Sequence, residues 1–197
     1  MSAATIVFAD IVGFSRKPSG EQRHLIEELT SEVVHELRVL LNPPMEAPSV
    51  LAMPTGDGMA LAFIHKPNQV WNRATLLRLI FRLHKWANER STALRIGIHT
   101  GAVQLVTDIN GRPNVAGDTV NLAQRVMDAA NPRQTLFSEA AFHEYVGVES
   151  PTLATSPFSQ ELKAEFLGPV QVHAKHGLQI LVCKLTLHPV QEFVVQR

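Results

Sequence analysis

The order of apolar and polar positions in the first fifty residues predicts a strand followed by a long helix. Residues 5–9 form a short apolar run rich in β-branched and aromatic side chains, which is typical of a central strand. Residues 21–41 then carry apolar side chains at spacings of three and four, which mark one buried stripe of a helix. Asn42, Pro43 and Pro44 are expected to end that helix.

The next segment predicts a hairpin and a second helix. Residues 50–53 and 59–63 are short apolar runs separated by PTGDG, so we expect two strands joined by a turn with Asp57 at its tip. Residues 70–88 return to helical spacing.

A further strand pair and a shorter helix follow. Residues 94–98 and 103–107 are apolar runs, and we expect two strands joined across residues 99–101. After the turn-rich sequence DINGRPN, a helix is predicted over about residues 119–130, with Asp118 as its N-cap.

The last third predicts a strand, a short helix, a surface loop and a closing antiparallel strand pair. These elements cover residues 135–138, 139–146, 149–157, 164–172 and 178–185. The order of elements predicts an α/β (α+β) sandwich in which helices pack on a mixed sheet. We interpret residues 1–197 as a single domain, with a core over about residues 4–186 and a tail over residues 187–197.

Composition limits the class of protein. The chain has 197 residues, 45% of them apolar, and 18 basic side chains balance 18 acidic ones, which excludes a disordered chain. Apolar runs are far shorter than the roughly 18 residues of a membrane-spanning helix, and the N-terminus lacks a basic signal region. Cys183 is alone, which excludes an intrachain disulfide framework. We therefore expect a soluble, cytoplasmic protein whose partners include neither nucleic acid nor a membrane.

Two aspartates are candidate metal ligands. Asp10 in FADIVGFS ends the first predicted strand, where a carboxylate beside outward backbone N–H groups suits a metal next to a phosphate. Gly13 in the same turn would let phosphate oxygens approach the backbone. Asp57 lies at the tip of the predicted hairpin, and two carboxylates on adjacent strand ends can hold two Mg²⁺ ions. The alternative is that Asp10 caps its turn and that Asp57 is an Asp-Gly turn residue.

Three further polar residues are candidates for contact with a phosphorylated ligand. Asn121 and Arg125 in GDTVNLAQR stand four residues apart on a helix, so they share a face and can reach one ligand. The alternative is an ordinary exposed pair on a surface helix. Lys175 in the turn HAKHG either reaches a terminal phosphate or is a solvated loop residue.

Taken in order, FADIVGFS, TGDGMALAF, GIHTG, GDTVNLAQR and SEAAF resemble the catalytic domain of class III nucleotidyl cyclases. The resemblance extends from about residue 5 to residue 142, with a looser match to residue 185. It implies the class III cyclase fold, with a ferredoxin-like βαββαβ core and a mixed sheet.

The resemblance also implies a homodimer with two active sites at the subunit interface. Asp10 and Asp57 would hold two divalent ions, Mg²⁺ or Mn²⁺, with the backbone carbonyl of Ile11 as a further ligand. The other subunit would supply Asn121 to orient the ribose and Arg125 to neutralise the transition state. Backbone groups that would hold the phosphates belong to Val12, Gly13, Phe14 and Ser15.

In this family the ribose 3′-hydroxyl attacks the α-phosphate, so the reaction would yield a 3′,5′-cyclic nucleotide and pyrophosphate. The chain departs from the family's purine-specific members where the base is bound. Met53 stands where they have Lys or Glu, and Asn114 where they usually have Asp or a small polar residue. Met53 cannot make the main hydrogen bond to a purine, whereas Asn114 can complement uracil or cytosine.

A compact cyclase without the purine-binding residues is similar to the pyrimidine cyclases of bacterial anti-phage (Pycsar) systems. That similarity implies production of cUMP or cCMP as a signal for a separate effector protein, and we favour UTP over CTP as the substrate. Two other hypotheses stay open. One is a divergent adenylate or guanylate cyclase, and the other is a non-catalytic nucleotide-binding module with the same fold.

Overall fold

The first six α-helices and β-strands of the computed structural model follow the order strand, helix, strand, strand, helix, strand. Their bounds are Ser2–Ile11 (β1), Ser19–Leu40 (α1), Val50–Pro54 (β2), Gly58–Ile64 (β3), Arg73–Glu89 (α2) and Leu94–Thr107 (β4). The structure describes residues 1–40, 50–66, 73–145, 162–173 and 177–189. The order is that of the expected ferredoxin-like βαββαβ core.

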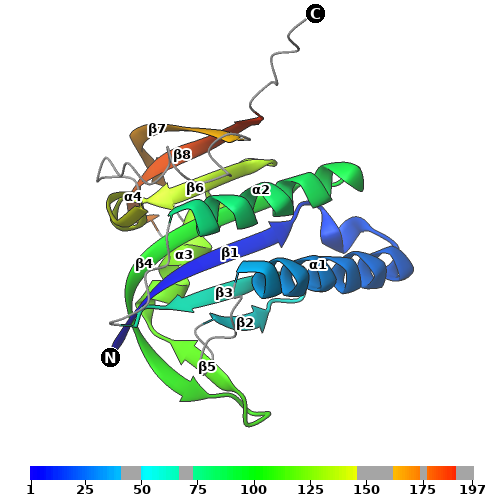
Figure 1. Cartoon of the computed structure of the whole chain (residues 1–197), viewed down its shortest axis with the longest axis horizontal. Coiled ribbons are helices and arrows are strands. Elements are labelled where there is room, and N and C mark those ends of the chain that lie inside the picture. Colours follow the sequence, from blue (N-terminus) through cyan, green and yellow to red (C-terminus); the bar gives the residue numbers. More distant parts are fainter. Residues whose placement is uncertain (41–49, 67–72, 146–161, 174–176, 190–197) are drawn as a thin grey trace, which may run out of the picture.

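Six more elements and one short 3₁₀ helix complete the described part of the chain. Their bounds are Phe14–Arg16 (η1), Pro113–Ala116 (β5), Asp118–Asp128 (α3), Gln134–Ser138 (β6), Glu139–Tyr145 (α4), Leu162–His173 (β7) and Gln179–Pro189 (β8). The strands form one sheet in the order β2-β3-β1-β4-β6-β8-β7, with β5 paired to β4 (Figure 1). Strands β4 and β6 are parallel and their neighbours pair antiparallel, so the predicted mixed sheet is confirmed.

Strand β1 lies near the centre of the sheet and divides the core into two layers. Its odd-numbered residues from Val7 to Ile11 pack in a cluster with α1 and α2, whereas its even-numbered residues from Ala4 to Phe8 pack in a cluster with α3. Because successive side chains of a strand point to opposite faces, Asp10 lies on the face that carries α3.

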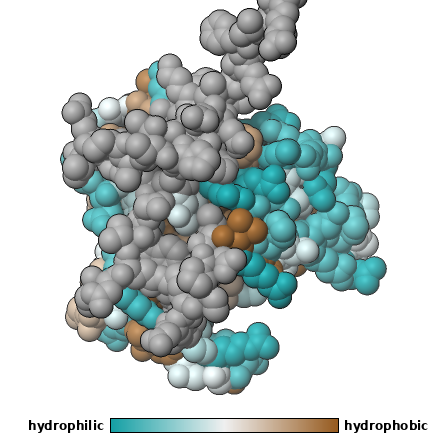
Figure 2. All heavy atoms as spheres, viewed as in Figure 1, coloured by the Kyte–Doolittle hydropathy of each residue, from teal (hydrophilic) through white to brown (hydrophobic). Residues whose placement is uncertain are grey.

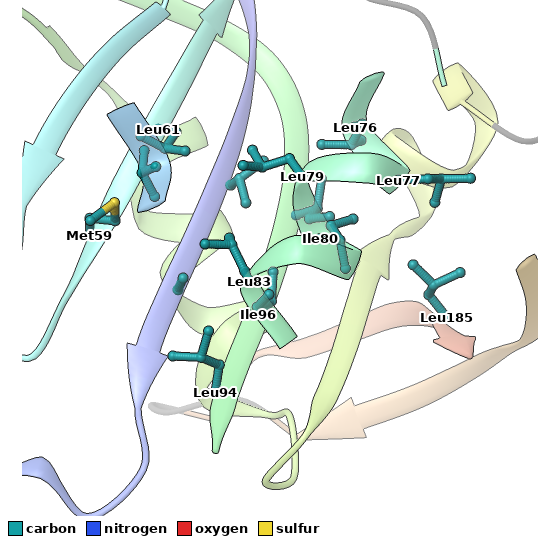
Figure 3. Packing of buried hydrophobic residues seen from close by; sticks show 14 of the residues in the cluster. Met59, Leu61, Leu76, Leu77, Leu79, Ile80, Leu83, Leu94, Ile96 and Leu185 are labelled. Atoms are coloured by element: carbon teal, nitrogen blue, oxygen red, sulfur yellow. The ribbon is translucent and has the colours of Figure 1, made fainter. Parts of the chain in front are cut away.

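Helices α1 and α2 cover the other face. Figure 3 shows Leu79, Ile80 and Leu83 of α2 against Leu94 and Ile96 of β4, and all five are buried. The outer surface where these two helices lie is mainly hydrophilic (Figure 2). No helix in the described ranges has the length and apolar composition needed to span a membrane.

The expected turn at residues 99–101 is wrong, because β4 continues through it as one strand. Strand β1 provides an uninterrupted antiparallel partner, in which Ile6 pairs with His99 and Ala4 with Gly101. Beyond the end of β1, residues 104–107 pair instead with β5, a strand that the sequence did not predict. The reversal lies at residues 108–112, where the Asp108 carboxylate accepts the backbone N–H groups of Asn110 and Arg112 at 2.8 and 2.9 Å.

Helix α3 begins differently from the prediction. Its N-cap is Gly117, with a φ of 131°, and no side chain in the described part of the chain caps it by a hydrogen bond. Asp118 is instead the first helical residue, where its charge still interacts favourably with the helix dipole.

Several predictions fall wholly or partly outside the described residues. They are the helix stop at 42–44, the helix start at 70–72, the loop at 149–157, Lys175 and the end of the tail. Strand β8 runs to Pro189, three residues beyond the predicted end of the core. Cys183 is buried, as expected of a small apolar side chain.

Candidate functional site

Asp10 and Asp57 lie side by side at one end of the sheet. Asp10 pairs with Gly58 in the β1–β3 ladder, and the N–H of Ile11 donates to the carbonyl of Asp57 at 2.9 Å. A Cβ atom at Gly58 would lie 2.0 Å from the carbonyl oxygen of Ala9, so only glycine allows this close approach. Asp10 is 5% exposed and Asp57 is exposed.

Arg95 is a third charged member of this cluster. It is the cross-strand partner of Asp10 in β4, and its Nε donates to Asp10 Oδ2 at 2.9 Å while Nη2 contacts the same oxygen. Burial raises the pKa of Asp10; the Arg95 guanidinium opposes this rise, and the Asp57 carboxylate adds to it. The cluster is therefore a buried carboxylate held by one cation beside a second carboxylate.

The sequence analysis missed Arg95, although a signal was present. In an antiparallel pair, a residue near the end of one strand meets a residue near the start of the next. Asp10 is next to last in β1 and Arg95 is second in β4, so the opposite charges indicate this pairing once β1 and β4 are taken as neighbours.

The carboxylate pair fits a divalent metal. Carboxylate oxygens are the ligands that Mg²⁺ and Mn²⁺ prefer, and a buried anion with one neighbouring cation has capacity for further positive charge. Within the described ranges, no cluster of three or more His, Cys, Asp or Glu side chains could hold a metal alone. Backbone carbonyl, water or substrate oxygens would therefore have to complete the coordination.

The loop after Asp10 presents a short run of backbone donors. Gly13 has a φ of 69°, in the left-handed region that favours glycine, and 3₁₀ helix η1 begins immediately after it. The first N–H groups of a helix have no partner within it, and Gly13, Phe14 and Ser15 stand at this start. The N–H of Val12 donates to the Ala93 carbonyl at 2.9 Å and is not available, which narrows the predicted phosphate loop to residues 13–15.

Asn121 and Arg125 share one side of α3, on the sheet face that also carries Asp10. Asn121 is exposed and Arg125 is half-buried, and neither side chain has a hydrogen bond or ion pair with any residue that the structure describes. A half-buried guanidinium with no anion beside it is well suited to an external anionic ligand.

Met53 and Asn114 lie at the β2 and β5 edge. Met53 is half-buried and packs against the same apolar cluster as Val115, the neighbour of Asn114 in β5. The Asn114 Oδ1 accepts the N–H of Val115 at 2.7 Å, so its carbonyl oxygen is partly engaged. The two residues therefore lie at the same edge of the sheet, with the Asn114 side chain on the face of β5 opposite to that of Val115.

Comparison with known proteins supplies the context for this geometry. The family described as the adenylate and guanylate cyclase catalytic domain matches residues 1–178. An uncharacterized protein of Mycobacterium tuberculosis, Rv1359, is 37% identical over 92 residues, which are 47% of this chain and 32% of that protein. The match thus spans about a third of the curated relative's length.

Solved structures share the fold over nearly the whole chain. The guanylate cyclase domain of RhGC from Catenaria anguillulae, in complex with GTP, is 17% identical with a TM-score of 0.66, covering 94% of this chain and 96% of that one. The adenylyl cyclase CyaB from P. aeruginosa is 16% identical with a TM-score of 0.67, covering 94% of both chains. A dimeric guanylyl cyclase domain of RhoGC from Blastocladiella emersonii is 18% identical with a TM-score of 0.64, covering 96% and 98%.

Proposed function

This chain belongs to the adenylate and guanylate cyclase catalytic domain family, and on that premise we propose that it is a nucleotidyl cyclase that converts UTP to cUMP and pyrophosphate. The observation that carries the proposal is the carboxylate pair of Asp10 and Asp57 on adjacent strand ends. Burying Asp10 beside a second carboxylate has a cost in stability, and the capacity to hold the two metal ions of a cyclase reaction would account for it.

Asp10, Asp57 and the backbone carbonyl of Ile11 would hold two divalent ions, Mg²⁺ or Mn²⁺. When bound, such ions would lower the pKa of the ribose 3′-hydroxyl and balance the charge of the triphosphate. The N–H groups of residues 13–15 would donate to the phosphates, as would Lys175. Arg95, which donates to Asp10, would be able to pair with a phosphate oxygen once metal ions neutralise that carboxylate.

Asn121 and Arg125 would act in a second copy of the chain. Neither side chain pairs with any described residue of its own chain, so both are available to a site on a partner subunit. The β4–β5 hairpin exposes Leu105, Val106 and Ile109, with Ile109 fully exposed, and this apolar surface suits a subunit interface.

The reaction forms one bond and breaks one. The 3′-hydroxyl oxygen attacks the α-phosphorus, its proton leaves to solvent or a base, and the bond from the α-phosphorus to the bridging oxygen breaks to release pyrophosphate. Arg125 would neutralise the charge that develops on the α-phosphate, and Asn121 would hold the ribose so that its 3′-oxygen is in line.

The choice of a pyrimidine rests on Met53 and Asn114. The Met53 thioether offers no donor or strong acceptor, so the main hydrogen bond to a purine base has no partner at that position. The Asn114 amide can donate to a carbonyl of uracil or of cytosine, and its Oδ1 already accepts a backbone N–H. UTP is the substrate that we propose, with CTP as the alternative. The product would act as a signal for a separate effector protein in defence against phage.

The test is a competition among substrates. Purified protein is incubated with equimolar ATP, GTP, CTP and UTP and with Mn²⁺, and the cyclic products are identified by mass spectrometry. We expect cUMP as the main product, lost in the Asp57→Ala variant.

Each other outcome corrects a defined part of the proposal. A cCMP peak would move the substrate to CTP, and cAMP or cGMP would support the divergent purine cyclase and remove the argument from Met53. Tight triphosphate binding without any cyclic product would support the non-catalytic module and overturn the cyclase.

A further inference from the structure

A hollow of about 510 Å³ lies between helix α2, the turn before β6, and strand β8. It is on the sheet face that carries α1 and α2, because α2 forms one wall and the core residue Leu185 contributes to its lining. Asp10 lies on the opposite face, so this hollow is separate from the carboxylate pair. Its volume is within the usual range for small-molecule sites.

The hollow has apolar and polar walls. Phe81, His84 and Lys85 of α2 line it at helical spacing, and Leu185 of β8 lies across from them. His84 Nε2 and Thr135 Oγ1 are 2.8 Å apart, and burial lowers the pKa of His84 to about 4. The imidazole is therefore neutral near pH 7 and contributes hydrogen bonding rather than charge.

Positive charge predominates at the rim. Lys85 and Arg133 both line the hollow, and the one acidic side chain in its lining, Glu89, lies 3.9 Å from Lys85. Glu89 also contacts Arg90, and Arg133 has no ion pair with any described residue. Lys184 also lines the hollow, but it is the neighbour of the buried Leu185 in β8, and neighbouring side chains of a strand point to opposite faces. Its charge is therefore left out of this balance. The balance favours an anion.

Arg133 adopts a conformation that its residue type rarely takes. Its φ is 63°, in the left-handed region, and its N–H donates to the carbonyl of Leu94 at 2.8 Å. Residues other than glycine hold such conformations only where their surroundings enforce them, and these positions cluster at functional sites. This backbone hydrogen bond connects the lining of the hollow to the start of β4.

The start of β4 also touches the candidate active site. Ala93 accepts the N–H of Val12 at 2.9 Å, and Arg95 holds the Asp10 carboxylate. Three consecutive residues, 93–95, therefore connect the hollow to the metal-binding loop through direct hydrogen bonds.

We propose that this hollow is a regulatory binding site for a small organic anion with an apolar body. Its anionic oxygens would pair with Lys85 and Arg133, and its body would lie against Phe81 and Leu185. Occupancy would move the Arg133 turn and, through Leu94, shift the Arg95–Asp10 pair. The binding part of this inference does not depend on cyclase activity.

The test uses phenyl phosphate as the probe and backbone amide NMR of the full chain as the readout. We expect saturable shifts at Arg133 and Thr135 and a smaller shift at Arg95. Lys85→Gln combined with Arg133→Asn should weaken binding at least about tenfold, because two charged partners are lost. Asparagine tolerates a positive φ, so the backbone of the turn is retained. Arg23→Gln, on the exposed face of α1, is the matched control and should bind as the parent does.

Three results would overturn the proposal. The first is the absence of any shift at about 10 mM probe, because a dissociation constant above that concentration is too weak for specific binding. The second is a set of shifts confined to Gly13–Ser15, which would place the probe in the phosphate loop. The third is a set of shifts around the hollow that persists unchanged in the double variant. Shifts at Arg133 without any at Arg95 would overturn the link to the active site.

Discussion

At the scale of single residues, the Asp10 side chain combines two opposing demands. A carboxylate at 5% exposure is costly for the folded chain, and Arg95 only partly offsets this because the pKa of Asp10 is still raised. The same burial lowers the effective dielectric constant around Asp10, so a metal ion bound there would interact strongly with its charge. The cluster is therefore arranged for binding rather than for stability.

Removal of Arg95 alone should be destabilising. Arg95→Met leaves the Asp10 carboxylate buried without its cation, so we expect the free energy of unfolding in urea to fall by about 1–3 kcal/mol. Adding Asp10→Asn should recover part of that loss, because the uncompensated charge is gone. The Asp10→Asn variant is measured alone as well. If the change in the free energy of unfolding of the double variant equals the sum of the changes in the two single variants, Asp10 and Arg95 are not energetically coupled.

His84 should make the fold sensitive to mild acid. Its pKa is lowered to about 4 by burial, whereas the unfolded chain protonates its histidines near pH 6.5. The unfolded state therefore binds more protons between these values, and the free energy of unfolding should fall as pH drops, by at most about 3 kcal/mol.

The matching measurement is urea unfolding between pH 7.5 and pH 4.5. His84→Gln keeps a hydrogen-bonding group for Thr135 but does not titrate, so its stability should depend less steeply on pH. His24→Gln, at an exposed position of α1, should retain the parent's slope. Equal slopes in all three proteins would show that His84 does not contribute.

At the scale of elements, the GIHTG sequence brings α3 against β4. A Cβ atom at Gly97 would lie 2.1 Å from the backbone nitrogen of Met127, and one at Gly101 would lie 2.7 Å from the Thr119 hydroxyl. That hydroxyl in turn donates to the Ala102 carbonyl. The two glycines therefore set the position of the helix that carries Asn121 and Arg125.

Gly97→Ala should displace α3. A methyl group at residue 97 would lie 2.1 Å from the Met127 backbone nitrogen, so α3 and β4 would have to move apart. We expect the free energy of unfolding to fall by about 3 kcal/mol. Gly20→Ala is the control, because no atom lies within 4 Å of a Cβ at this position in α1. Its free energy of unfolding should rise by about 0.5–1 kcal/mol, since alanine favours a helix more than glycine does. A stability for Gly97→Ala like that of the parent would contradict the close packing.

At the scale of the whole molecule, the proposed function divides one site between two copies of the chain. Asp10, Asp57 and Arg95 gather at the end of β1, and the Arg125 side chain on α3 has no ion pair with any described residue. The exposed hairpin side chains Leu105, Val106 and Ile109 supply apolar surface for association of two copies.

Mixing two inactive variants should restore cyclase activity if the sites are shared. Asp57→Ala and Arg125→Ala each lack one half, and a mixed dimer contains one site with both halves intact. Equal mixing gives mixed dimers in half of the population, so we expect about a quarter of the parent activity. Product formation is followed by mass spectrometry after the variants are refolded together. No recovery, despite mixed dimers on native electrophoresis, would place all catalytic groups in one chain.

Local pattern was sufficient for most elements of the fold. Periodicity located α1, α2, α3 and the strands β1, β2 and β3, because a buried stripe or an apolar run depends only on neighbouring residues. The fragments around Asp10, Asp57 and Arg125 were visible for the same reason: each is a short sequence on one element. The roles of these residues were inferred because the motifs, in their order along the chain, resemble those of class III cyclases. Those roles stay predictions.

Tertiary structure decided what depends on residues distant in the sequence. Strand β4 continues through residues 99–101 because β1 pairs along them, and β5 exists because β4 extends beyond β1. The Arg95–Asp10 pair joins residues 85 positions apart, and the hollow beside α2 joins three segments. Sequence by itself determined the elements and the candidate chemistry, since these are local properties. Only the folded chain decided which charges meet, because strand register and helix packing are set by partners far along the chain.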